Sequence, residues 1–106
     1  MSGPDHPTAG DAPEVVVYWR PGCPYCVRLR RGLHRAGVPT REVDIWSDAD
    51  GATFVRHHAE GNETVPTVDV AGTVLVNPPA HRVAELAEAA GVPVVPPGGL
   101  LRRFTR

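Results

Sequence analysis

The chain has 106 residues, of which 42% are hydrophobic and 22% charged, and its formal net charge is -1. This length predicts one domain with a single modest core. The balanced charge gives no overall basis for binding nucleic acid or a membrane. No segment is long and apolar enough to cross a bilayer, and residues 1–13 lack the apolar stretch of a signal peptide. We therefore expect a monomer in the cytoplasm.

Prolines concentrate near both ends of the chain. Positions 4, 7 and 13 are prolines, as are positions 93, 96 and 97. We expect residues 1–13 to form a flexible tail, residues 14–90 the folded domain, and residues 91–106 a basic tail rich in proline and glycine.

The first ordered segment is Glu14-Val-Val-Val-Tyr-Trp19, which is β-branched and aromatic on both faces and predicts a central buried strand. It leads into a helix with Cys23 at the cap and Pro24 at the first helical position. The helix presents an apolar stripe and ends at Gly37; the stripe consists of Cys26, Leu29, Leu33 and Ala36.

The middle of the chain predicts a second strand over Thr40–Ile45 and then a helix over residues 49–59, although Gly51 weakens the helical pattern. Either Ser47 or Asp48 suits the cap of that helix. Two short alternating strands follow, over residues 67–70 and 73–76, and Ala71-Gly72 joins them as a hairpin whose register the pattern leaves open.

The last predicted helix is capped by Asn77, opens at Pro78 and stops at Gly91, and its buried face is Val83, Leu86, Ala87 and Ala90. The element order is therefore βαβαββα. A strand-helix-strand unit gives a parallel pair by a right-handed crossover, and the hairpin completes a mixed four-stranded sheet flanked by helices. This α/β arrangement is the thioredoxin fold.

The two cysteines of the chain lie together in one Cys-x-x-Cys motif, which points to redox chemistry or metal binding rather than to a disulfide framework. Thiol-disulfide exchange needs a thiolate, and the N-terminus of a helix stabilises a negative sulfur. Arg20 and Arg28 add positive charge nearby. We expect Cys23 to face solvent as the attacking sulfur and Cys26, in the apolar stripe, to be the resolving thiol.

Zinc binding is the alternative for this motif, but a tetrahedral site wants four ligands and the chain has no second Cys-x-x-Cys. His57 and His58 are the candidate additional ligands. Because adjacent helical residues point in different directions, we expect both to be exposed instead, and we predict no metal site.

Six arginines (20, 28, 30, 31, 35 and 41) and no acidic residue lie between Arg20 and Arg41. The region therefore carries a positive field. Two interpretations stay open: the arginines steer acidic partner surfaces toward the thiolate, or they form an ordinary solvated helix face.

The order of two motifs resembles the glutaredoxin family over about residues 15–90. Cys23-Pro-Tyr-Cys26 follows one strand, and Thr64-Val-Pro66 directly precedes another. The resemblance implies a cis peptide before Pro66, with the Val65 backbone beside the active sulfur to pair with an extended thiol substrate. It also implies the following substrate-binding positions: Arg20, Tyr25, Thr64, Val65, Pro66 and Asn77. Arg20 stands where glutaredoxins usually have a lysine that contacts the substrate carboxylate.

One departure from the family pattern favours a particular branch. Classical glutaredoxins have a Gly-Gly pair before the last helix, whereas this chain has Val76-Asn77-Pro78. Together with Gly61–Thr67, this segment resembles the mycoredoxins, which reduce mixed disulfides between proteins and mycothiol. The resemblance implies no bound cofactor, a low-molecular-weight thiol (mycothiol or glutathione) as co-substrate, and disulfide-containing proteins and a flavoprotein disulfide reductase as partners.

Three other functions stay open on the sequence. The first is a redoxin that a thioredoxin reductase reduces and that donates electrons to ribonucleotide reductase. The second is a [2Fe-2S] carrier in which two chains share a cluster through Cys23 and a small thiol, although proline after the first cysteine disfavours it within the family. The third is a binding module without redox activity.

Overall fold

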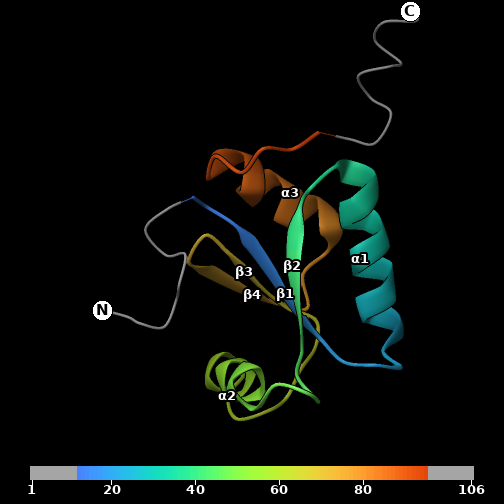
Figure 1. Ribbon diagram of the computed structural model, residues 1–106, viewed down its shortest axis with the longest axis vertical. Helices are drawn as coiled ribbons and strands as arrows, with labels where there is room; N and C mark the ends of the chain where they lie inside the picture. The colour runs from blue at the N-terminus through green and yellow to red at the C-terminus, as the bar shows by residue number, and fades with distance from the viewer. Residues whose placement is uncertain (1–11, 96–106) are drawn as a thin grey trace, which may run out of the picture.

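The computed structural model describes residues 12–95, and in this part of the chain the elements follow the expected order (Figure 1). The strands are β1 (Val15–Trp19), β2 (Thr40–Asp44), β3 (Thr67–Val70) and β4 (Thr73–Val76), and the helices are α1 (Pro24–Ala36), α2 (Ala49–His58) and α3 (Ala80–Ala89). The strand order in the sheet is β2-β1-β3-β4, with β1 parallel to β2 and antiparallel to β3. The predicted mixed sheet and the thioredoxin fold are confirmed.

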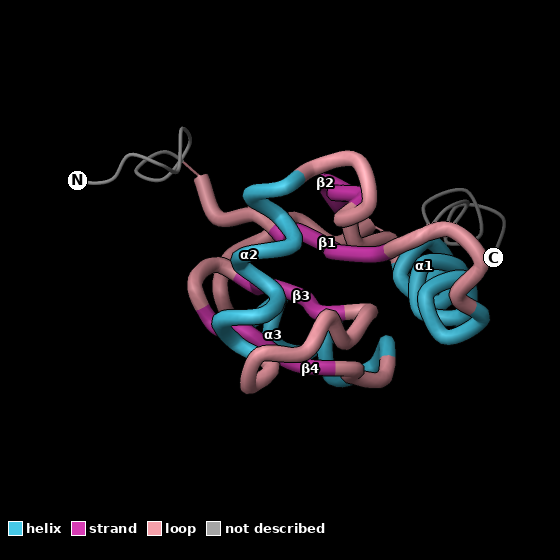
Figure 2. The backbone as a smooth tube through the Cα atoms, turned by 90° about the horizontal axis from the view of Figure 1, so that it is seen from below, coloured by secondary structure: helices cyan, strands magenta, loops and turns pink. Residues whose placement is uncertain are grey.

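The central strand β1 is buried on both faces, as its composition predicts. Val15 and Val17 point into a core shared with α1 and α3, whereas Val16 and Tyr18 point into a second core shared with α2. Figures 1 and 2 show the corresponding layers, with α2 on one side of the sheet and α3 on the other. Both cysteines of the motif belong to the second core.

Helix α1 has the expected limits. Its predicted stripe is buried at Cys26, Leu29 and Leu33, and the helix ends at Gly37, whose φ of 79° is the left-handed conformation that glycine favours. Gly32 allows α1 to approach α3 closely, since a Cβ on Gly32 would lie 2.7 Å from the Cβ of Ala80.

Helix α2 is capped by Asp48, whose side chain accepts a hydrogen bond from the Gly51 N–H at 2.9 Å. The glycine that weakened the sequence pattern has a packing role. A Cβ on Gly51 would lie 2.7 Å from Cγ1 of Val43, so its absence lets α2 pack closely against β2. Tertiary packing here outweighs helix propensity.

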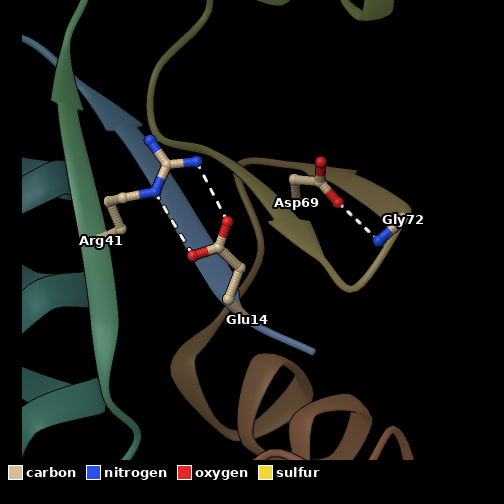
Figure 3. Close-up of polar contacts among 4 residues, drawn as sticks. All are labelled: Glu14, Arg41, Asp69 and Gly72. Carbon is tan, nitrogen blue, oxygen red and sulfur yellow. Dashed lines mark hydrogen bonds and ion pairs between the residues drawn. The ribbon is translucent and has the colours of Figure 1, made fainter. Parts of the chain in front are cut away.

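The hairpin turn adopts positive φ at both central residues, 49° at Ala71 and 101° at Gly72. Its register pairs Val70 with Thr73, and the Gly72 N–H donates to the Asp69 carboxylate at 2.8 Å (Figure 3). Positive φ at both positions matches the strand twist, which suits a two-residue hairpin loop.

Figure 3 also shows a two-bond ion pair between β2 and the residue that precedes β1. Arg41 donates through Nε and Nη2 to the two carboxylate oxygens of Glu14, at 3.3 and 3.1 Å. Both side chains remain partly exposed, so the pair supports the edge of the sheet rather than its core.

The start of α3 differs from the prediction. The helix begins at Ala80 with Pro79 at its cap and no side-chain cap hydrogen bond, so Asn77 is not the cap and Pro78 does not open the helix. The reason is steric, because a residue that precedes proline is disfavoured in the helical conformation and Pro78 precedes Pro79. Asn77 instead has a φ of 53° in the connecting loop.

The end of α3 also departs slightly from the pattern. Ala90, predicted on the buried face, is the exposed C-cap residue. Beyond it, Val92 is buried in the core, and the Val95 N–H donates to the Gly37 carbonyl at 3.0 Å. This part of the predicted C-terminal tail therefore packs on the domain. The rest of both predicted tails, residues 1–11 and 96–106, lies outside the described residues, and the domain division stays a prediction.

Candidate active site

Cys23 lies at the junction between the central strand and α1. Gly22, with a φ of 79°, turns the chain, and Cys23 is the N-cap residue in an extended conformation. Its Sγ accepts a hydrogen bond from the Cys26 N–H at 3.2 Å. The sulfur thus stands where an N-cap oxygen usually does, at the positive end of the helix dipole.

The expectation that Cys23 faces solvent is wrong for this structure, because the residue is only 4% exposed. Two contacts explain its position. The Cys26 N–H holds the sulfur on one side, and the Val65 carbonyl oxygen lies 3.9 Å from it on the other. The neighbours Pro24 and Tyr25 are exposed, so Cys23 lies at the rim of the second core.

Cys26 is more deeply buried than Cys23, at 1% exposure. Burial raises the pKa of the Cys26 thiol to about 11, and the neighbouring Cys23 side chain adds to the rise, while a backbone hydrogen bond from Arg20 opposes it. Cys26 is therefore protonated at neutral pH. Both cysteines are free thiols in this structure.

The Thr64-Val-Pro66 segment lies directly beside the cysteines. The Val65–Pro66 peptide is cis, as the resemblance implied. The Thr67 hydroxyl donates to the Thr64 carbonyl at 2.8 Å across this turn. The segment thus presents the Val65 carbonyl to the Cys23 sulfur.

Asn77 joins the same region through the backbone. Its N–H donates to the Pro66 carbonyl at 2.7 Å, which ties the loop before α3 to the start of β3. The residue predicted as a helix cap is thereby placed next to the turn that faces the cysteines. A groove of about 410 Å³ begins here, and its lining includes Asn77, Tyr25 and Arg28.

Arg20 and Trp46 form a pair that sequence reasoning missed. The Arg20 guanidinium lies 5.6 Å from the centre of the Trp46 ring, within the range of a cation–π contact. Trp46 is 64% exposed, and its backbone N–H donates to the Asp44 carboxylate. The sequence signal for this pair was a large aromatic residue, Trp46, in a polar loop directly after a strand.

Of the predicted site residues, Arg20 and Val65 contact the Cys23–Cys26 pair directly through their backbones. Thr64 and Pro66 flank Val65, and Asn77 is joined to Pro66. Tyr25, in the first turn of α1, is 60% exposed next to them. Arg28 lies one turn farther along, in the groove.

The two histidines considered as candidate zinc ligands lie away from the cysteines. His57 and His58 are exposed at the end of α2, where the His58 ring contacts Phe54. Within residues 12–95, no group of three or more His, Cys, Asp or Glu side chains is placed to hold a metal ion. In the same residues, no helix has the length and apolar character needed to cross a membrane.

Comparison with known proteins gives one consistent family. The glutaredoxin family model matches residues 15–76. A Mycobacterium tuberculosis protein named as glutaredoxin Rv3198A is 40% identical over 79 residues, which cover 73% of this chain and 94% of the relative. Glutaredoxin-C2 of Arabidopsis thaliana is 37% identical over 60 residues, covering 55% of this chain and 54% of that protein.

Solved structures agree with the fold. Glutaredoxin C1 from Populus tremula x tremuloides, in its holo form, superposes with a TM-score of 0.56 at 28% identity, covering 78% of this chain and 90% of that one. The glutaredoxin of Archaeoglobus fulgidus has a TM-score of 0.58 at 22% identity, covering 80% and 97%. By sequence match, fold and motif order, the chain belongs to the glutaredoxin family of thiol-disulfide oxidoreductases.

Proposed function

We propose that this protein reduces mixed disulfides between proteins and a low-molecular-weight thiol, with Cys23 as the attacking sulfur and Cys26 as the resolving thiol. The hydrogen bond from the Cys26 N–H to Cys23 Sγ is the observation that carries this proposal. A backbone donor and the helix dipole both favour a negative charge on a sulfur in this place. Cys26, in contrast, is buried and protonated.

In the proposed reaction, the Cys23 thiolate attacks the sulfur of the small thiol within the mixed disulfide. The protein sulfur leaves as a thiolate and takes a proton from water, and a new disulfide joins Cys23 to the small thiol. A second small thiol, as its thiolate, attacks the small-thiol sulfur of that adduct. The products are the Cys23 thiolate and the disulfide of the small thiol, so atoms and electrons balance.

The second route passes through Cys26. Cys26 loses its proton and attacks Cys23 Sγ, which releases the small thiol and forms a Cys23–Cys26 disulfide. An external reductase must then supply two electrons. Because burial raises the pKa of Cys26 to about 11, the Cys26 thiolate is scarce at neutral pH. We therefore propose that the second small thiol releases most of the adduct at neutral pH, and that Cys26 acts as the resolving thiol in the route linked to an external reductase.

Attack by Cys23 requires that its sulfur become accessible. The residue is 4% exposed, and its sulfur is turned toward Val65. A change of the χ1 rotamer moves the sulfur without moving the backbone. The neighbours Pro24 and Tyr25 are exposed, and Tyr25 lines the groove.

The residues around Cys23 are proposed to hold the substrate. Val65 would pair through its backbone with the extended thiol, supported by the turn at Thr64 and Pro66. Arg20 would contact a carboxylate or another polar group of the small thiol. Tyr25 and Asn77 line the groove next to the sulfur and would flank the thiol on that side.

Mycothiol is the proposed thiol. The loop Val76-Asn77-Pro78 stands where classical glutaredoxins have a Gly-Gly pair, and it resembles the mycoredoxin branch. Relatives from Mycobacterium tuberculosis are 40% identical over most of their length. The solved buckwheat glutaredoxin–glutathione complex is 19% identical and supports the fold alone.

The test uses one carrier protein with a single cysteine, loaded with either mycothiol or glutathione. Wild-type and Cys26→Ser proteins are expected to release the carrier thiol when the matching free thiol is supplied, and Cys23→Ser is expected to release none. A higher kcat/KM for the mycothiol adduct than for the glutathione adduct supports the mycoredoxin branch. Full activity of Cys23→Ser would refute the assignment, and equal or better use of glutathione would refute mycothiol.

A coupled assay separates the redoxin alternative. Thioredoxin reductase and NADPH replace the small thiol, and NADPH oxidation is followed with a protein disulfide as acceptor. This route needs the Cys23–Cys26 disulfide, so Cys26→Ser is the matched control. Rapid NADPH oxidation by the wild-type protein that Cys26→Ser loses would replace our proposal with a reductase-coupled redoxin.

A further inference from the structure

The outward face of α1 carries three cationic side chains without a partner in the part of the chain that the structure describes. Arg28, Arg31 and Arg35 are exposed and follow spacings of three and four residues, so they lie along the helix surface. Arg30, in contrast, pairs with Glu42 at 2.8 Å and lies over the ring of Trp19. Arg28, Arg31 and Arg35 are thus available to a partner of opposite charge.

These arginines border two different hollows. The groove of about 410 Å³ lies between α1 and the loop that leads into α3, and Arg28 and Arg35 line it. A more open depression of about 480 Å³ lies on the other flank of α1, and Arg31 and Arg35 line that one. Arg28 and Arg31 therefore carry the same charge on the same helix but face different hollows.

The groove beside Arg28 combines an apolar floor with a cationic border. Leu29, Gly32, Pro78, Pro79 and Ala80 supply apolar lining, and His81 lies at the α3 side. No acidic side chain among the described residues lines this groove. The chain as a whole has a net charge of -1, so this concentration of positive charge is local.

The groove also connects with the candidate active site. Tyr25 and Asn77 line its near end, and Arg35 lies ten residues farther along α1 than Tyr25. At the helical rise of 1.5 Å per residue this is about 15 Å, which corresponds to about four or five residues of an extended chain. A polypeptide whose cysteine has reached Cys23 has this groove next to it.

We infer that this groove docks an extended acidic segment of the protein substrate, with its carboxylates on Arg28 and Arg35 and an apolar side chain on the floor beside Leu29 and Pro79. The inference rests on the proposed function, since it takes the mixed disulfide of the same substrate to lie at Cys23. Bidentate pairing with carboxylates suits the arginine guanidinium. Charge complementarity of this kind raises the association rate and selects partners.

The test compares two peptides that differ in charge alone. Each carries one cysteine in a mixed disulfide with the same small thiol. One peptide has four Asp or Glu residues beside the cysteine, and the other has the matching Asn or Gln residues. For the wild-type protein at low salt, kcat/KM is expected to favour the acidic peptide by roughly fivefold or more, and high salt should remove the preference.

Arg28→Glu and Arg31→Glu form a matched pair of variants, with the same charge change on the same helix. Arg28→Glu is expected to abolish or invert the ratio between the two peptides, and Arg31→Glu to keep most of it. Circular dichroism verifies that both variants fold. Arg28→Gln serves as a milder second variant and should reduce the ratio toward one. An equal loss of the preference for the acidic peptide in Arg28→Glu and Arg31→Glu would mean that a general positive field acts. That result would overturn the proposal that the groove docks the peptide.

A binding measurement separates this inference from the catalytic proposal. The same acidic peptide, with serine in place of its cysteine and a fluorescent label, is titrated with wild-type protein and with Arg28→Glu. Weaker binding by Arg28→Glu supports the groove even if no disulfide is turned over. Three results would each refute the inference. The first is that the peptide does not bind the wild-type protein, and the second is that a single-stranded oligonucleotide binds more tightly than the peptide. The third is that Arg28→Glu lowers turnover of both cysteine peptides by the same factor.

Discussion

The backbone N–H of Cys26 donates a hydrogen bond to Cys23 Sγ at 3.2 Å, so the second cysteine of the motif holds the first through its main chain. Its own thiol is buried and has a pKa raised to about 11. The two sulfurs therefore stand in different environments one helical turn apart. This difference leads to the first two predictions.

The first prediction concerns the pH dependence of the route through Cys26. With a small thiol attached to Cys23, release of that thiol by Cys26 should accelerate about tenfold per pH unit from neutral pH up to about pH 10 and then level off above about pH 11, because the Cys26 thiolate grows in that proportion. Burial is the largest cause of the raised pKa, and we expect it to persist in the adduct. Stopped-flow detection of the released thiol measures the rate.

Cys26→Ser is the control for this experiment and should release no thiol at any pH without an external reductant. A wild-type rate that levels off near pH 8 would contradict the raised pKa of Cys26.

The second prediction concerns the order of alkylation. Under native conditions at pH 8, iodoacetamide should modify Cys23 first and leave Cys26 largely unmodified, since Cys26 is 1% exposed and protonated. Cys23, at 4% exposure, should react more slowly once a substrate occupies the groove. Tandem mass spectrometry of the peptide that holds both cysteines identifies the modified sulfur.

The Cys23→Ser protein tests the same point separately. Its Cys26 should stay unmodified until guanidinium unfolds the chain, and rapid native labelling of Cys26 would show that the second core is open.

The third prediction concerns the contact between α1 and α3. Replacing a helical glycine by alanine normally stabilises a helix by about 1 kcal/mol. Gly32→Ala should instead lower the free energy of unfolding by about 1 kcal/mol or more, because its Cβ would lie 2.7 Å from the Cβ of Ala80 and force the two helices apart. Urea unfolding measures the change.

The companion change is Ala80→Gly, which removes the opposing carbon. In the Ala80→Gly protein, Gly32→Ala should be neutral or stabilising, and the double-mutant cycle should show favourable coupling. Additive effects of the two changes would mean that the helices are not in contact at these positions.

The fourth prediction concerns Tyr18, which lies in the second core. Burial raises its pKa, the charge of Asp69 raises it further, and Arg41 lowers it. Arg41→Gln should therefore raise the pKa of Tyr18, because the phenolate loses a favourable charge and Glu14 loses its partner. Absorbance titration near 295 nm measures the ionisation in a Tyr25→Phe background, where Tyr18 is the remaining tyrosine. An unchanged or lowered pKa of Tyr18 would contradict the proposed influence of Arg41 on its phenolate.

Several parts of the site follow from local sequence chemistry. Pro24 after Cys23 predicts the start of α1, and the helix does begin there with the sulfur at its cap. The burial of β1 on both faces follows from its composition. The position of Asn77 beside the site was implied by the family resemblance, although its predicted capping role was wrong.

Other features depend on residues far apart in the chain. Gly51 is unfavourable for a helix by propensity alone, but its place in α2 is explained by the close approach of Val43. The Arg20–Trp46 pair joins two loops that no short pattern connects. The burial of Cys23 depends on Val65, which is 42 positions away.

The sequence by itself determined the order of elements, the two faces of the central strand and the placement of a sulfur at a helix N-terminus, since each of these depends on side chains a few residues apart. The tertiary structure decided which sulfur is more deeply covered, how closely α1 and α3 approach, and which arginines border one groove. These depend on contacts between distant segments, where a single missing or added carbon changes the packing.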